Sequence, residues 1–175
     1  MLKTFVTLGV DPGISSCGFG LVKFYNNKFE LLDSGIIRTN AKNSTSEKLK
    51  EIFSGLNKII KKSQPDFLAV EDSFFAKNVK SLKVMSQAKG VILLAGAQAG
   101  LSIKEYSTRE VKQSVVGRGE ASKQQVQYMM KALLNIKAAT LPEDASDALA
   151  VAFCHSQKIS NHHQWLYHGV ARGKK

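Results

Sequence analysis

The sequence predicts one α/β domain in which a mixed five-stranded sheet carries helices on both faces. Three observations predict it. Short apolar segments typical of strands alternate with amphipathic helical segments, no linker or repeat interrupts the chain, and 175 residues suffice for one core. The expected order is three strands, a helix, a strand, a helix, a strand and three helices. We set the domain at residues 1–157 and expect residues 158–175 to form a flexible basic tail.

The first part of the chain predicts an antiparallel meander of three strands. Residues 5–10 are short and apolar, and residues 11–13 (Asp-Pro-Gly) end this first strand. Residues 17–25 and 29–39 predict two further strands, joined by a turn at residues 26–27 (Asn-Asn). The meander is therefore expected at one edge of the sheet.

The remainder of the chain predicts helices that alternate with two buried strands, at residues 67–70 and 102–106. The first helix, residues 46–62, has apolar residues at i, i+3, i+4 and i+7, with Ser46 as its N-cap. The later helices are expected at residues 81–100, 108–116 (capped by Thr108), 121–134 and 142–157 (opened by Pro142).

The charge of the chain favours a polyanionic partner. The net charge is +11, and residues 77–123 carry nine basic against three acidic side chains. Such an excess favours nucleic acid through counterion release, although a solvated soluble surface is an alternative. No segment approaches the ~20 apolar residues of a membrane span, so we expect a cytoplasmic protein that does not bind membranes. Cys17 and Cys154 are interpreted as buried thiols.

Four carboxylates stand where a purely structural role is hard to assign. Asp11 directly follows the first strand and Glu71 the fourth, so parallel neighbouring strands would bring both to one sheet edge, where sites of α/β sheets gather. Asp144 and Asp147, spaced i, i+3, share one face of the last helix. Four converging carboxylates repel one another unless a cation lies among them. Their oxygens suit Mg²⁺, with Mn²⁺ as a substitute, as one or two ions.

Each acid also has a structural alternative. Asp11 can be a turn residue before Pro-Gly, and Asp144 can interact with the helix dipole. Asp72 or Glu143 can be the ligands in place of their neighbours. Jointly, however, an acidic cluster inside a basic chain is typical of a nuclease, which needs a positive cradle for phosphates and a negative pocket for metal.

Several separated blocks resemble the RuvC family of Holliday junction resolvases. The resemblance runs from residue 8 to about residue 155, and the blocks keep the family's order and spacing. It implies an RNase H-like fold and a crossover junction endodeoxyribonuclease. The blocks are LGVDPG (8–13), LAVEDSFFAKN (68–78), QAKGV (87–91), VKQSVVGRG (111–119) and EDASDALAVA (143–152).

The resemblance also implies roles for single residues. Asp11, Glu71, Asp144 and Asp147 match the family's four acidic metal ligands. Phe74 matches an aromatic that contacts unpaired bases near the crossover, although the neighbouring Phe75 can exchange roles with it. The basic residues expected to contact DNA are Lys77, Lys83, Lys112, Arg118 and Lys123, of which Lys112 and Lys123 match positions near the scissile phosphate and join the acids as catalytic residues.

The implied function is the resolution of Holliday junctions in DNA recombination and repair. A Mg²⁺-dependent homodimer would nick two opposed strands of four-way junction DNA, together with a junction-binding and branch-migration motor complex. Residues 81–100 are the expected dimer contact, unless this helix packs only on its own sheet. Two other functions remain open: a phosphotransferase of the actin-like ATPase type, and a junction-binding module without catalysis.

Overall fold

The computed structural model describes residues 4–72 and 79–171, with side chains described up to residue 161. The predicted five-stranded mixed sheet is confirmed, with strand order β3-β2-β1-β4-β5. The first three strands form the antiparallel meander, and β1, β4 and β5 are parallel. The elements are β1 (Phe5–Asp11), β2 (Ser16–Tyr25), β3 (Lys28–Arg38), α1 (Thr45–Ser63), β4 (Phe67–Asp72), α2 (Val79–Gln98), β5 (Ser102–Ser107), α3 (Thr108–Val116), α4 (Lys123–Leu133) and α5 (Glu143–Ala171).

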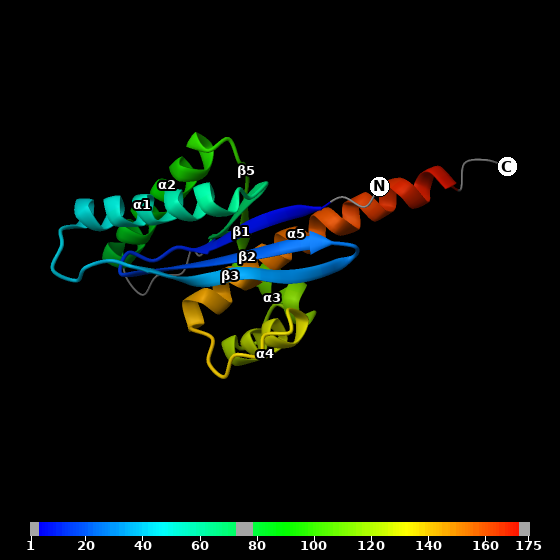
Figure 1. Cartoon of the computed structure of the whole chain (residues 1–175). Coiled ribbons are helices and arrows are strands. Elements are labelled where there is room, and N and C mark those ends of the chain that lie inside the picture. Colours follow the sequence, from blue (N-terminus) through cyan, green and yellow to red (C-terminus); the bar gives the residue numbers. More distant parts are fainter. Residues whose placement is uncertain (1–3, 73–78, 172–175) are drawn as a thin grey trace.

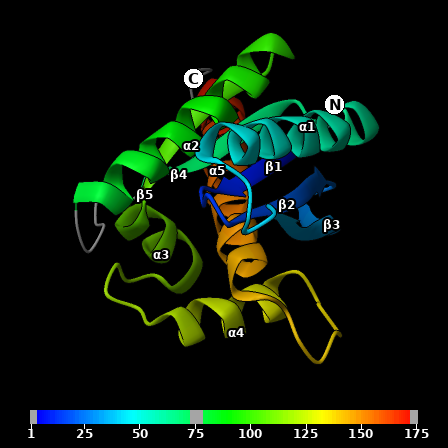
Figure 2. The same ribbon diagram turned by 90° about the vertical axis from the view of Figure 1, so that its left-hand side faces the viewer.

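Helices cover both faces of the sheet, as predicted (Figure 1). Helices α1 and α2 pack on one face over a core that includes Leu8, Val10 and Val70. Helix α5 crosses the other face, and α3 and α4 lie against it on the side away from α1 (Figure 2). Within the described residues, no helix has the length and apolar character needed to cross a membrane.

Two predicted helix caps were wrong by one or two residues. The N-cap of α1 is Ser44 rather than Ser46, and that of α3 is Ser107 rather than Thr108. In both helices the true cap forms a capping box, because a glutamate three residues later (Glu47 or Glu110) binds back to the cap backbone. The paired bonds satisfy two exposed backbone donors, which a serine without a glutamate at that spacing cannot do.

The last helix is longer than predicted. It was expected to end at residue 157 and be followed by a flexible tail, but α5 continues to Ala171. Ser160, three residues beyond the predicted end, is still buried. Ser156, one residue before that end, is also buried, and its hydroxyl donates to Thr7 Oγ1 at 2.9 Å. These small polar residues continue the packed face of the helix, although they do not register as apolar in the sequence pattern.

Candidate metal centre

The sheet places Asp11 and Glu71 side by side. Val10 of β1 pairs with Val70 of the parallel strand β4, so the next residue of each strand is the acid. Alternate residues of a strand face opposite sides of the sheet. Val10 and Val70 face α1 and α2, so Asp11 and Glu71 both face α5 and α3. The strand-end position and the alternation together therefore direct both carboxylates to one place.

Glycines in β1 and β2 bring the backbone of α5 directly onto the sheet. A Cβ on Gly9 would lie 2.1 Å from the Ala148 carbonyl oxygen, and a Cβ on Gly18 would lie 2.0 Å from the carbonyl oxygen of Asp144. Since no side chain fits at these contacts, the first turns of α5 are held at a fixed distance from β1. The glycines thus position both aspartates of α5 without touching their carboxylates.

Asp144 and Asp147 lie in the first two turns of α5, and both are half-buried. The predicted packing face of this helix is fully buried, including Ala145, Ala148 and Leu149. Asp147 lines a cavity of about 690 Å³ together with Asp11 and Glu71, whereas Asp144 does not line it. The structure therefore brings three of the four predicted acids into one cavity, with the fourth one helical turn away.

The cavity combines acidic and basic side chains. Glu120 adds a fourth carboxylate to its lining. Its basic side chains are Arg109 at the start of α3, Lys112 in the middle of α3 and Lys123 at the start of α4. The cavity therefore offers hard oxygen ligands beside cationic groups of the kind that bind phosphate.

The acids repel one another and resist ionisation. Burial raises the pKa of Asp11 to about 8, helped by the neighbouring charges of Glu71, Asp147 and Asp144. Burial also raises the pKa of Glu71 and that of Asp147. With its pKa at about 8, Asp11 keeps its proton at neutral pH unless a positive charge arrives. The electrostatics of the cavity therefore favour the uptake of a cation.

Three of the four acids accept a hydrogen bond from a side chain of the protein. Thr108 Oγ1 donates to Glu71, Ser16 Oγ donates to Asp144, and Lys123 Nζ donates to Asp147 Oδ2 at 3.1 Å. In these positions, no three His, Cys, Asp or Glu side chains of the described chain converge closely enough to share one ion. The donor set is nevertheless all carboxylate oxygen, which fits Mg²⁺ or Mn²⁺ better than softer metals.

The two alternative acids turn away from this cavity. Asp72 is next to Glu71 on β4, so it faces the opposite side of the sheet, where Lys89 of α2 pairs with it at 2.5 Å. Glu143 pairs with Lys123 and does not line the cavity. Glu71 and Asp147 are thus better placed than Asp72 and Glu143.

The predicted DNA contacts differ in their positions. Lys112 and Lys123 line the cavity. Lys83 is exposed on α2 and Arg118 is exposed between α3 and α4, and neither lines the cavity. Phe74, with its alternative Phe75, and Lys77 lie outside the described residues.

Comparison with known proteins gives the family. A family model described as crossover junction endodeoxyribonuclease RuvC matches residues 7–155. The chain belongs to the RuvC family. A crossover junction endodeoxyribonuclease RuvC from Alkaliphilus metalliredigens is 47% identical over 162 residues, which cover 93% of this chain and 98% of that relative. The family identity makes the chain an endonuclease, and it confirms the predicted resemblance.

Solved structures confirm the RNase H-like fold of this RuvC-family chain. The structure of T. thermophilus RuvC in complex with a Holliday junction substrate has a TM-score of 0.83 and 30% identity, covering 89% of this chain and 94% of that one. The yeast mitochondrial Holliday junction resolvase has a TM-score of 0.65 at 11% identity, covering 91% of this chain and 82% of that one. At that identity the second structure supports the fold alone.

Sequence reasoning missed four polar residues at the RuvC-type site: Ser16, Thr108, Arg109 and Glu120. Thr108 was interpreted as a helix cap, which concealed its contact with Glu71. The Ser-x-x-Glu spacing of Ser107 and Glu110 is the signal that identifies the true cap and leaves Thr108 for another role. No comparable signal marks Ser16, because its partner Asp144 lies 128 residues away.

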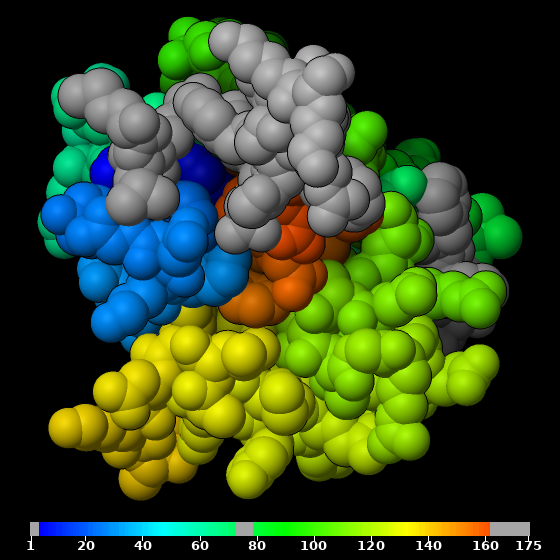
Figure 3. All heavy atoms as spheres, turned by 90° about the vertical axis from the view of Figure 1, so that its right-hand side faces the viewer, coloured from blue at the N-terminus to red at the C-terminus, as the bar shows by residue number. Residues whose placement is uncertain are grey.

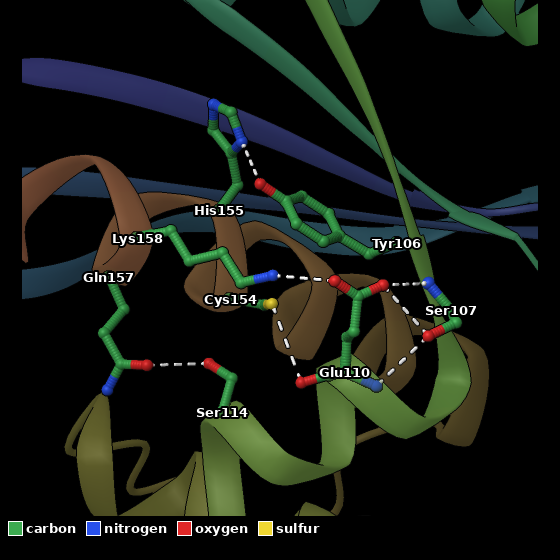
Figure 4. A network of polar contacts seen from close by, with 8 residues as sticks. All are labelled: Tyr106, Ser107, Glu110, Ser114, Cys154, His155, Gln157 and Lys158. Carbon is green, nitrogen blue, oxygen red and sulfur yellow. Dashed lines mark hydrogen bonds and ion pairs between the residues drawn. The ribbon is translucent and has the colours of Figure 1, made fainter. Parts of the chain in front are cut away.

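A polar network joins α3 to α5 and so fixes the helix that carries Thr108 and Lys112 (Figure 4). Lys158 of α5 donates to Glu110 Oε1 at 2.9 Å and lies 4.4 Å from the centre of the Tyr106 ring. In addition, Ser114 donates to Gln157 at 2.9 Å. Figure 3 shows α3 and α4 as a continuous flank (yellow-green to yellow) beside α5 (orange).

His155, which joins this network through Tyr106 (Figure 4), is expected to make the RuvC-type fold sensitive to acid. Its Nδ1 is 2.9 Å from the Tyr106 hydroxyl, and burial with the nearby Lys104 and Lys158 lowers the pKa of His155 from 6.5 to about 4. The neutral form is therefore favoured in the fold, so this contribution is complete above pH 6.5 and is lost as the pH falls towards 4. When the pH is lowered from 7 to 4.5, the free energy of unfolding of wild type should fall by about 2 kcal/mol more than that of His155→Gln. Urea denaturation at the two pH values measures both losses. Equal losses would contradict this.

Proposed function

We propose that this chain resolves Holliday junctions in DNA recombination and repair. As a cytoplasmic homodimer, it nicks two opposed strands of four-way junction DNA in a Mg²⁺-dependent reaction. The observation that carries the proposal is the cavity in which Asp11, Glu71 and Asp147 lie beside Lys112 and Lys123. The complex of the T. thermophilus relative with a Holliday junction substrate supports the choice of DNA structure.

The carboxylates are the proposed metal ligands. Asp11, Glu71 and Asp147 line the cavity, and Asp144 completes the set from the first turn of α5. Mg²⁺ bound there supplies an activated water and charge stabilisation for the leaving oxygen of the phosphodiester, and Mn²⁺ can substitute for it. Because the acids are crowded, their ionisation is coupled to metal uptake, so metal affinity should rise with pH.

The basic residues of the cavity are the proposed phosphate contacts. Lys112, Lys123 and the previously overlooked Arg109 can hold the scissile phosphate while charge develops on it. The Lys123 side chain is 61% exposed and pairs with Glu143 and with Asp147, whose own side chain is 18% exposed, so it can turn to a phosphate when a cation takes its place beside Asp147. Lys123 is therefore both a counterion of the resting site and a DNA contact.

Two further proposed contacts lie outside the cavity. We propose that Lys83 and Arg118 bind the DNA backbone from exposed positions on α2 and between α3 and α4. The family resemblance implies that Phe74, three positions after Glu71 in the sequence, stacks on unpaired bases and that Lys77 contacts DNA. A branch-migration motor complex that binds junctions is the further partner implied.

The proposed dimer needs a different face of α2 from the one the sequence indicated. On the helix expected to form the dimer contact, the small and apolar residues Ala88, Ile92 and Ala95 are fully buried within the protomer. The exposed side of the helix includes Leu94, whose side chain is 51% exposed. If α2 supplies the contact, Leu94 rather than Ile92 lies at it.

Cleavage of a synthetic four-way junction tests the proposed function. With Mg²⁺ the junction should be cut at two symmetric positions on opposed strands, whereas chelation by EDTA should stop cleavage. Linear duplex of the same sequence is the control substrate, and sedimentation of the protein without DNA tests the dimer. Equal cleavage of linear duplex would point to a general nuclease, and binding without cleavage would point to a non-catalytic module.

Junction affinity is expected to weaken steeply with salt. Binding by lysines and arginines releases counterions, so log affinity should fall linearly with log salt, with a slope of about −0.9 for each phosphate neutralised. Fluorescence anisotropy at several NaCl concentrations measures this slope, and Arg118→Ala should reduce it by about one if Arg118 binds a phosphate. An affinity that does not change with salt would contradict a phosphate-dominated interface.

A further inference from the structure

Two hydroxyl groups contact the acids of the proposed metal centre from opposite sides. Ser16 Oγ donates to Oδ2 of Asp144, and Thr108 Oγ1 donates to Oε1 of Glu71. A carboxylate can accept hydrogen bonds on both oxygens, so one donor leaves the second oxygen available to a cation. The same arrangement thus occurs twice, at carboxylates that come from a helix and from a strand.

The local backbone brings Ser16 close to Asp144. Ser16 begins β2, and Gly18 lies two residues later on the same face, directly beneath the carbonyl of Asp144. The preceding loop also turns tightly, since a Cβ on Gly13 would lie 2.0 Å from the Ser16 carbonyl oxygen. The close backbone contacts at Gly13 and Gly18 therefore hold Ser16 near Asp144.

The Thr108 contact follows from strand register and helix capping. Glu71 pairs with Tyr106 of β5, so Thr108 lies only two residues beyond the register partner of the acid. Ser107 caps α3 with Glu110, so the Thr108 hydroxyl is not needed for the cap. Thr108 is exposed and lines the cavity, so its hydroxyl is available to donate to Glu71.

We propose that Ser16 and Thr108 are positioning residues that set the metal affinity of the site. Each fixes one oxygen of a ligand carboxylate and so presents the other oxygen to the cation in a restricted orientation. This inference rests on the proposed function, because it assumes that Asp144 and Glu71 are metal ligands. Outer hydrogen-bond partners of this kind typically change metal affinity by about 10–100-fold when they are removed.

Direct metal titration without DNA tests the inference. Mn²⁺ bound to the full chain is measured by the loss of its electron paramagnetic resonance signal, and Mg²⁺ affinity follows from competition. Thr108→Val and Ser16→Ala should each weaken Mn²⁺ binding by about 10-fold or more, while Thr108→Ser and Ser16→Thr should restore most of it. Ser54→Ala is the matched control, since Ser54 is an exposed hydroxyl on α1, across the sheet from α5.

The outcomes separate this inference from the proposed function. Thermal unfolding without metal should change little in Thr108→Val, because the capping box of α3 remains. Unchanged Mn²⁺ affinity in both hydroxyl-free variants would overturn the inference without contradicting the proposed function. Absence of Mn²⁺ binding to wild type would also overturn the inference. Conversely, a wild type that binds Mn²⁺ but cuts no junction would overturn the proposed function, and the affinity comparison would still stand.

Discussion

Asp11→Asn is expected to abolish junction cleavage and to leave junction binding unchanged. The asparagine keeps the shape of the side chain but removes a charged oxygen ligand from a cavity that also holds Glu71 and Asp147. Metal-assisted stabilisation of the transition state is worth several kcal/mol, so the rate should fall by about 1,000-fold or more. Binding depends instead on the basic surface. Single-turnover cleavage and anisotropy on the same junction measure the two effects.

The same variant should be more stable than wild type when metal is absent. The pKa of Asp11 is about 8 in the fold and near 4 in the unfolded chain, so its cost to stability is absent at low pH and grows as the pH rises from about 4 to about 8. In EDTA at pH 8.5, Asp11→Asn should therefore unfold at a higher temperature than wild type, and the difference should vanish near pH 4. For the cleavage experiment, a wild-type rate in Asp11→Asn would rule out Asp11 as a metal ligand.

Gly9→Ala is expected to destabilise the fold strongly, although it adds only one methyl group. Its Cβ would lie 2.1 Å from the Ala148 carbonyl oxygen and 2.6 Å from the backbone nitrogen of Ala152. Backbone atoms cannot rotate away as a side chain does, so α5 must lift from β1. Overpacking of this kind costs about 3 kcal/mol, which lowers the melting temperature by roughly 10 °C in a chain of this size. Differential scanning calorimetry measures the loss.

Gly90→Ala is the matched control. Gly90 lies within α2, where an added Cβ meets nothing within 4 Å, and alanine is the better helix former. This variant should be as stable as wild type or more stable by up to about 1 kcal/mol. If both alanine variants unfolded at the wild-type temperature, the tight contact between α5 and the sheet would be contradicted.

The acids could be predicted as candidate ligands because their position and spacing carry a signal. An acid directly after an apolar strand, such as Asp11 or Glu71, is conspicuous in the sequence, and so is an i, i+3 pair on a helix. The parallel pairing of β1 and β4 then brings the two strand-end acids together, as expected. The alternation of strand faces also decides between Glu71 and Asp72, although the sequence alone left that choice open.

Other features depend on distant contacts that local patterns do not contain. The hydrogen bond of Ser16 to Asp144 and that of Ser156 to Thr7 join residues 128 and 149 positions apart. The extension of α5 to Ala171 was also missed, because the buried face of the helix continues as far as Ser160 in small polar residues, which give no apolar pattern. The helix caps, in contrast, were local errors that the capping-box spacing corrects.

The glycines beneath α5 mean that the proposed ion site depends partly on residues that have no ligating atom. Ordinary contact distances begin at 3.4 Å, so a methyl group at position 9 requires a displacement of more than 1 Å from the 2.1 Å contact. Metal–ligand bonds tolerate about ±0.2 Å. A chain that retained all four acids but carried alanine at position 9 would keep the acidic motif of the family. Its helix α5 would nevertheless hold the two proposed aspartate ligands too far from β1. Searches for active members of this fold should therefore score the helix–sheet spacing together with the acids.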